Sequence, residues 1–135
     1  MIGADACPVL TVPLRDERDI AAARSAVSRE LDKRGARALR KVRFVTAVSE
    51  IVRNAVDHGG GGEMSVFVKE RPLEIWVRCT DTGPGIADID EALQDGFSTA
   101  RSMGKGLGGA KRLVDSFEIT SRVGGGTTVE ISAAL

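Results

Sequence analysis

Three polar residues in the first half of the sequence have a spacing that suits chemistry. Glu50, Asn54 and Asp57 follow one another at i, i+4 and i+7 in a segment with helical periodicity, so they lie in one narrow stripe. A carboxylate and a carboxamide one turn apart can act as a general base and as a ligand for a hard cation. Because any amphipathic helix also needs a polar face for solvent, the stripe alone leaves both interpretations open.

A second candidate is the segment that begins at Asp81. It follows residues 73–80, which alternate apolar and polar positions like a half-buried strand. Asp81 has the parity of the apolar positions, so its carboxylate is predicted to point towards the core, where it needs hydrogen-bond donors from the protein or from a ligand. Gly83 and Gly85 predict a sharp turn whose backbone lies close to whatever fills that space. Taken alone, this segment fits an ordinary turn equally well.

A glycine-rich segment between Gly96 and Lys111 leads into a predicted helix, whose free N–H groups can bind phosphate oxygens. It is not a dinucleotide fingerprint, because no strand immediately precedes the glycines. It is not a Walker A loop either, because Gly106 stands where a Ser or Thr must follow Lys105. Phosphate binding here therefore requires another architecture. Thr127 is predicted to point inward from the start of the last strand, and by itself carries no functional weight.

The elements that must position these residues follow from the periodicity of apolar residues. Predicted strands cover residues 9–14, 64–69, 73–80, 117–121 and 127–133, and predicted helices cover residues 17–34 (capped by Asp16), 36–58, 88–94 and 107–116. Adjacent strands joined by short turns imply antiparallel pairing. We therefore predict a single domain, residues 1–135, of the α/β (α+β) class: a two-layer sandwich with a mixed, mostly antiparallel sheet and helices on one face.

The composition excludes several classes of partner. Lys+Arg and Asp+Glu balance at 19 each, so no net charge attracts nucleic acid or an anionic membrane. Four Phe, one Trp and no Tyr are too few for a base-stacking platform. Cys7 and Cys79 fit no metal-ligand spacing, and Cys79 is predicted to be a buried thiol. No apolar run reaches the length of a membrane span, so we expect a cytoplasmic protein.

Taken together, these segments resemble the four nucleotide-binding boxes of the GHKL ATPase and kinase superfamily, whose fold is the Bergerat ATP-binding fold. They occur in the order of that superfamily and extend across most of the chain. The matching segments are Glu50-x-x-x-Asn54 (N box), Asp81-x-Gly83-x-Gly85 (first glycine box), Gly104-x-Gly106-x-Gly108 (second glycine box) and Gly126-Thr127 (last box).

Within that superfamily the chain is most similar to the small anti-sigma-factor-type serine/threonine kinases, and among these to the RsbT-type switch kinases of the bacterial stressosome. The similarity extends from about residue 16 to residue 131 and is strongest over residues 49–54, 95–99 and 106–113. The chain departs from the RsbT pattern at Gly109, where that pattern has a proline. This departure leaves open the shape of the junction between the lid and the following helix.

The resemblance implies ATP and Mg²⁺ as cofactors and a role for each matching residue. Asp81 would accept a hydrogen bond from the adenine amino group, with Thr127 assisting. Asn54 would coordinate Mg²⁺, and Glu50 would be the general base. The turn at the adenine would be shaped by Gly83 and Gly85, and the lid over the phosphates would consist of Gly104, Lys105, Gly106 and Gly108.

Other residues near these boxes allow simpler interpretations. Arg53 could reach a phosphate or a partner, but an ion pair with Glu50 or Asp57 explains it equally well. His58 ends the long helix, where a cation is favoured, so we expect a structural role. An aromatic pair, Phe67 and Trp76, is predicted on the open face of the sheet, where it would suit a partner or a homodimer contact. Trp76 could also simply cover the sheet.

Two functions remain open from the sequence. In the first, the protein is a serine/threonine kinase that transfers the ATP γ-phosphate to a STAS-domain antagonist protein and acts as a partner switch in a stress or sigma-factor pathway. A PP2C-type phosphatase would be a second partner. In the alternative, it is an anti-sigma factor that sequesters a sigma subunit. Both rest on the resemblance. A single nucleotide domain must find its phosphate acceptor in another molecule, and the RsbT-like lid sequence favours the kinase over a protein that holds a sigma factor.

Overall fold

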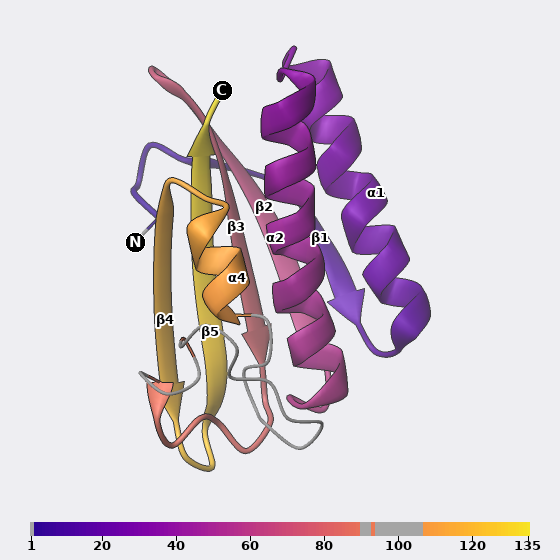
Figure 1. The fold of residues 1–135 in the computed structure, drawn as a ribbon, viewed down its shortest axis with the longest axis vertical. Coiled ribbons are helices and arrows are strands. Elements are labelled where there is room, and N and C mark those ends of the chain that lie inside the picture. Colours follow the sequence, from indigo (N-terminus) through magenta and orange to yellow (C-terminus); the bar gives the residue numbers. More distant parts are fainter. Residues whose placement is uncertain (1, 90–92, 94–106) are drawn as a thin grey trace.

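The computed structural model describes residues 2–89, 93 and 107–135. Five strands form one sheet, which is one of the two layers of the fold (Figure 1). The strand order is β1-β2-β3-β5-β4, and all four neighbouring pairs are antiparallel. The strands are β1 (Cys7–Leu14), β2 (Gly62–Glu70), β3 (Leu73–Asp81), β4 (Ser116–Arg122) and β5 (Gly126–Ala134). The predicted α/β class is thus confirmed, but the described sheet is antiparallel throughout rather than mixed.

Among the described residues, three helices cover one face of this sheet (Figure 1): α1 (Glu17–Lys33), α2 (Ala38–Asp57) and α4 (Leu107–Arg112). The hydrophobic core lies between the two layers, so the predicted two-layer sandwich is confirmed. Its most buried members include Val27, Leu31, Phe44, Val48, Val52, Met64, Val66, Ile75, Val77, Leu107 and Ile131. No helix in the described ranges is both long enough and apolar enough to cross a membrane.

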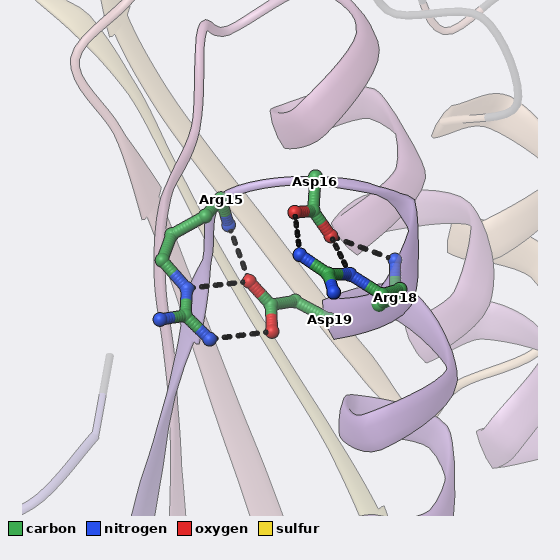
Figure 2. A network of polar contacts seen from close by, with 4 residues as sticks. All are labelled: Arg15, Asp16, Arg18 and Asp19. Carbon is green, nitrogen blue, oxygen red and sulfur yellow. Dashed lines mark hydrogen bonds and ion pairs between the residues drawn. The ribbon is translucent and has the colours of Figure 1, made fainter.

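The start of α1 is fixed by two carboxylates, each bound to an arginine (Figure 2). Asp16 caps the helix, because its side chain accepts a hydrogen bond from the Arg18 backbone N–H at 2.9 Å. Asp19 accepts hydrogen bonds from the backbone N–H of Arg15 at 2.7 Å and from its guanidinium at 3.0 and 3.1 Å. These bonds lower the pKa of Asp19 to about 2. The predicted cap at Asp16 is confirmed, whereas the sequence analysis missed the Arg15–Asp19 pair.

The long helix α2 carries the Glu50 stripe and ends where the sequence predicts. The residue after its last turn is His58, and Gly59 follows; both backbone N–H groups donate to the carbonyl of Asn54, at 3.0 and 3.2 Å. Gly60 and Gly61 have φ of 72° and 99°, a conformation that glycine adopts without steric cost. The four-glycine run, residues 59–62, therefore terminates α2 and turns the chain into β2.

The last helix is shorter than predicted. The sequence predicts a helix over residues 107–116, but α4 ends at Arg112. Beyond it, the Asp115 backbone N–H donates to the carbonyl of Ser132, and Phe117 is already paired with Ile131 in the sheet. Residues 113–116 therefore do not continue the helix, because the chain pairs with β5 instead.

The predicted helix at 88–94 lies mostly outside the described ranges, which lack residues 90–92 and 94. One helical hydrogen bond is described there, from the Leu93 N–H to the Ile89 carbonyl at 3.0 Å.

Candidate functional site

Asp81 is the last residue of β3, the middle strand of the sheet, between Gly62 on β2 and Thr127 on β5. It is 7% exposed, and its inward direction is as predicted. Oδ1 of the carboxylate accepts hydrogen bonds from the backbone N–H groups of Gly83 at 3.0 Å and Thr127 at 3.2 Å. Oδ2 has no hydrogen bond from any residue that the structure describes. One oxygen is thus fixed by the protein, and the other is open to water or to a donor on a ligand.

The electrostatic surroundings of Asp81 favour such a donor. Burial raises the pKa of Asp81, and the N–H groups of Gly83 and Thr127 oppose this effect only in part. A further N–H donor at Oδ2 would stabilise the ionised carboxylate. Burial also raises the pKa of the neighbouring Cys79 to about 12, with a further contribution from the Asp81 charge. Cys79 is therefore a buried thiol at neutral pH, as predicted.

The end of α2 lies directly against Asp81. A Cβ at Gly59 would lie 2.4 Å from Cγ of Asp81 and 2.6 Å from Oδ2, which is closer than side chains approach one another. A Cβ at Gly83 would lie 2.5 Å from the Gly59 carbonyl oxygen, and one at Gly85 would lie 2.2 Å from the Arg122 carbonyl oxygen. The predicted close approach at Gly83 and Gly85 is confirmed, and the atoms approached belong to the protein's own backbone.

Ser121 on β4 was missed by the sequence analysis, although it links three parts of the site. Its Oγ accepts the Ile86 backbone N–H at 2.7 Å and lies 2.8 Å from Oγ1 of Thr127 and 3.2 Å from the carbonyl oxygen of Gly126. It thereby ties the loop after Asp81 to the buried Thr127. The alternation of residues along β4 could have identified it, because Ser121 lies on the same, inner side of the strand as Ile119.

Replacing Ser121 by alanine is expected to weaken nucleotide binding by roughly 5- to 30-fold. The Ile86 N–H loses its acceptor and Thr127 loses the partner that orients its hydroxyl, and each of these two hydrogen bonds is worth about 1 kcal/mol. The effect is expected on the KM for the nucleotide rather than on kcat, because Ser121 contacts Thr127, the pairing partner of Asp81. The matched control is Thr120→Ala, on the exposed side of the same strand. Equal KM values for the two variants would contradict a positioning role for Ser121.

The predicted stripe on α2 is only partly a solvated surface. Asn54 is 6% exposed and Glu50 is half-buried, whereas Asp57 is exposed. The C-terminal half of the helix lies over the end of β3, because the Cys79 thiol is 3.8 Å from the Ile51 carbonyl oxygen and Gly59 contacts Asp81. The fold therefore brings the helix turn that carries Asn54 to the strand end that carries Asp81.

Arg53 differs from the sequence expectation. Its guanidinium Nη1 lies 3.9 Å from Oε1 of Glu17 at the start of α1, rather than pairing with Glu50 or Asp57. Both side chains are substantially exposed, so the pair contributes little stability. The reason is the packing of α1 beside α2, which the helical spacing within α2 could not reveal.

Among the predicted lid residues, only Gly108 can be placed. It is buried in the first turn of α4, whereas Gly104, Lys105 and Gly106 lie outside the described residues. A Cβ at Gly109 would meet no atom within 4 Å, so a larger residue fits there. The departure from the family pattern at Gly109 is therefore not imposed by packing.

The aromatic pair lies on the sheet face away from the helices, as predicted. Phe67 and Trp76 are directly paired across β2 and β3, and both are half-buried. The Arg78 guanidinium lies 5.1 Å from the centroid of the Phe67 ring, and Trp76 Nε1 donates to Oε1 of Glu74 at 3.1 Å. Polar side chains on the same face thus contact both rings.

The residues present fit a nucleotide with an exocyclic amino group. Oδ2 of Asp81 lacks a donor within the described ranges, and the glycines around it leave no space for competing side chains. Asn54 supplies an amide oxygen, a suitable ligand for Mg²⁺. No group of three His, Cys, Asp or Glu residues in the described part of the chain could hold a metal by itself. A bound Mg²⁺ would therefore take most of its ligands from phosphates and water.

Comparisons with known proteins show the family to which the chain belongs. Residues 40–135 match the family of histidine kinase-, DNA gyrase B- and HSP90-like ATPases. Over 121 residues the chain is 36% identical to serine/threonine-protein kinase RsbT of Bacillus subtilis (strain 168), covering 88% of this chain and 91% of that protein. It is 34% identical over 99 residues to an anti-sigma F factor of Bacillus cytotoxicus, covering 67% of this chain and 66% of that protein.

A solved structure shows the same fold. The crystal structure of the RsbU and RsbW domains of Rv1364c from Mycobacterium tuberculosis aligns with a TM-score of 0.66 at 22% identity, over 95% of this chain and 33% of that chain. The family match over most of the chain, together with the identity to RsbT, identifies this protein as a member of the histidine kinase-, DNA gyrase B- and HSP90-like ATPase family and, within it, of the RsbT-type serine/threonine protein kinases.

Proposed function

We propose that this protein uses ATP and Mg²⁺ to phosphorylate a serine or threonine of a STAS-domain antagonist protein, as a partner switch in a stress or sigma-factor pathway. The observation that carries the proposal is the buried Asp81, whose Oδ1 is held by two backbone N–H groups while Oδ2 faces no donor in the described residues. An adenine amino group would donate to Oδ2, with Thr127 assisting from the adjacent strand.

The metal-binding and general-base roles are assigned to residues of α2, the helix that ends beside Asp81. The Asn54 amide oxygen would hold Mg²⁺, and the half-buried Glu50 carboxylate would accept the proton of the incoming hydroxyl. When bound, Mg²⁺ supplies positive charge that neutralises the phosphate oxygens. Gly104, Lys105, Gly106 and Gly108 are proposed to cover the phosphates. Positioning and charge account for most of the catalysis in phosphoryl transfer, so a small domain is sufficient.

We also propose that residues 1–135 form one ATP-binding kinase domain. The family match begins at residue 40, but β1 pairs with β2 along its length and α1 packs against α2. The first two elements are therefore part of the same sheet and the same helical layer as the matched region. The Phe67–Trp76 pair on the open sheet face is a proposed contact for a partner or for a second copy of the chain.

The test of the kinase function is transfer of labelled phosphate from ATP to a purified STAS-domain protein. Glu50→Ala is expected to retain ATP binding and to lower phosphotransfer by a factor of roughly 10²–10⁴, the usual contribution of a general base. Asp57→Ala is the matched control, because it removes an exposed carboxylate from the same helix face. Undiminished transfer by Glu50→Ala would assign the base to another residue, and absence of label with the unaltered protein would contradict the kinase proposal.

A second candidate function has its own support. The 34% identity to an anti-sigma F factor favours sequestration of a sigma subunit, with or without phosphotransfer. Size-exclusion chromatography of the protein mixed with a purified sigma factor separates the two functions. A stable complex with no phosphate transfer to a STAS-domain protein would favour the binding role.

A further inference from the structure

The first turns of α2 carry exposed aliphatic side chains beside basic ones. Leu39 is 73% exposed and Val42 is 59% exposed, and they lie one helical turn apart. Arg37, Arg40 and Arg43 alternate with them along the same segment. Exposed aliphatic side chains are costly in water, and when they adjoin a hollow they indicate a surface for a partner.

A groove of about 410 Å³ opens beside these turns, between α2 and the segment that joins α4 to β4. A second hollow adjoins it and shares Arg37 and Arg40 as lining residues, so the two form one surface. We call this surface the α2 groove. It is defined by Arg37, Leu39, Arg40, Arg43, Leu113 and Val114.

The α2 groove has an excess of positive charge. Its lining contains three guanidinium groups and one carboxylate, that of Asp115. Oδ2 of Asp115 is already occupied, because it accepts the Arg40 Nη1–H at 3.3 Å and the backbone N–H of Ala134 at 2.7 Å. Arg43 donates to the neutral carbonyl of Arg112 at 3.1 Å, so its charge is not neutralised by that bond. The side chain of Arg37 makes no hydrogen bond or ion pair with a residue in the described ranges.

The helix end beside the groove does not balance this charge. The chain as a whole has a formal net charge of zero. The first turn of α2 contains no acidic residue and has no side-chain cap, whereas the first turn of α1 contains Glu17 and Asp19 and is capped by Asp16. Negative charge is favoured at a helix N-terminus, and the first turn of α2 has none of its own. A carboxylate of a partner bound there would therefore interact favourably with the helix dipole.

We propose that the α2 groove docks an acidic segment of a partner protein. Carboxylates of the segment would pair with Arg37, Arg40 and Arg43, and an aliphatic side chain would pack against Leu39, Leu113 and Val114. An amphipathic helix with acidic and leucine positions presents both groups at once. Arg40 precedes Glu50 by ten residues, about 15 Å along the helix axis, so the α2 groove is separate from the Asp81 site. The inference goes beyond the proposed function and does not require phosphotransfer.

The test uses the full chain, labelled with ¹⁵N, and two synthetic helical peptides of roughly four turns. Both peptides carry leucine at the same positions, and they differ only in having Glu or Lys at the flanking positions. The acidic peptide is expected to give saturable shifts of the amide signals of residues 37–43 and 113–115, and the basic peptide none. Shifts at these residues with phosphatidylglycerol vesicles but not with the acidic peptide would assign the surface to membranes and overturn the proposal.

Two variants make the assignment specific. Arg37→Glu and Leu39→Gln alter exposed side chains, and each is expected to weaken binding of the acidic peptide by about tenfold. The matched controls are Arg29→Glu, an exposed arginine on α1, and Val123→Gln, an exposed valine on the β4–β5 turn; both are expected to bind like the unaltered protein. Binding that is unchanged in Arg37→Glu and Leu39→Gln, or absent in the unaltered protein, would overturn the proposal.

Discussion

Replacing Asp81 by asparagine is expected to abolish useful ATP binding, although the two side chains have the same shape. The Oδ1 position must accept the N–H groups of Gly83 and Thr127, so the single oxygen of asparagine would take that position. Its NH₂ group would then occupy the place of Oδ2 and oppose the adenine amino group, donor against donor. Loss of a buried, charged hydrogen bond costs about 2–5 kcal/mol, roughly 30-fold to several thousand-fold in affinity.

This result is measured by titration with a fluorescent ATP analogue, together with thermal unfolding of the protein without nucleotide. Burial raises the pKa of Asp81, which means that the buried charge itself is unfavourable; removing it should leave the free energy of unfolding unchanged or higher at neutral pH. A loss of affinity without a loss of stability thus separates recognition from folding. Asp57→Asn is the control on an exposed carboxylate. Unchanged affinity in Asp81→Asn would refute the proposed adenine role.

Gly59→Ala is expected to have a comparable effect on ATP binding through a different cause. The new Cβ would lie 2.4 Å from Cγ of Asp81, so the carboxylate must move and its bonds to Gly83 and Thr127 must weaken. Gly59 does not have a positive φ, so the backbone itself accepts alanine. Overpacking of this kind costs about 1–3 kcal/mol of stability, and the displaced acceptor would no longer meet the base.

The neighbouring glycine provides the matched control. Gly60 has φ of 72°, but a Cβ there would meet no atom within 4 Å. Gly60→Ala should therefore cost about 1 kcal/mol of stability through backbone strain while leaving the ATP affinity intact. The pair is measured by urea unfolding and by the same nucleotide titration. If Gly59→Ala and Gly60→Ala had equal ATP affinities, the contact between Gly59 and Asp81 would not matter for binding.

The sequence predicted the elements and the direction of the main side chains because these depend on local periodicity. The alternation of residues 73–80 correctly placed Asp81 on the inner face, and helical spacing correctly predicted the two long helices α1 and α2. The predicted end of the long helix at His58 lies within one residue of the observed end of α2 at Asp57. In each case, one continuous segment contains all the information that the prediction needs.

Apart from the local Arg15–Asp19 pair, the missed features depend on contacts between distant segments. Gly59 is essential to the geometry only because Asp81, on another element, lies against it, and Ser121 matters only because Ile86 and Thr127 meet it. The premature end of α4 results from pairing with β5, and the Glu17 partner of Arg53 results from helix packing. The proposed chemical roles of Glu50, Asn54 and the lid residues remain predictions.

The position of Asp81 on the middle strand couples the proposed recognition of ATP to the integrity of the whole fold. The acceptor, its two backbone donors and the strand that presents them exist together only when β2, β3 and β5 are paired. A ligand held in this way binds the folded chain and not the unfolded one, and at a concentration one hundred times its Kd it stabilises the fold by about 2.7 kcal/mol. The cellular ATP level would thus set how resistant this protein is to unfolding and proteolysis.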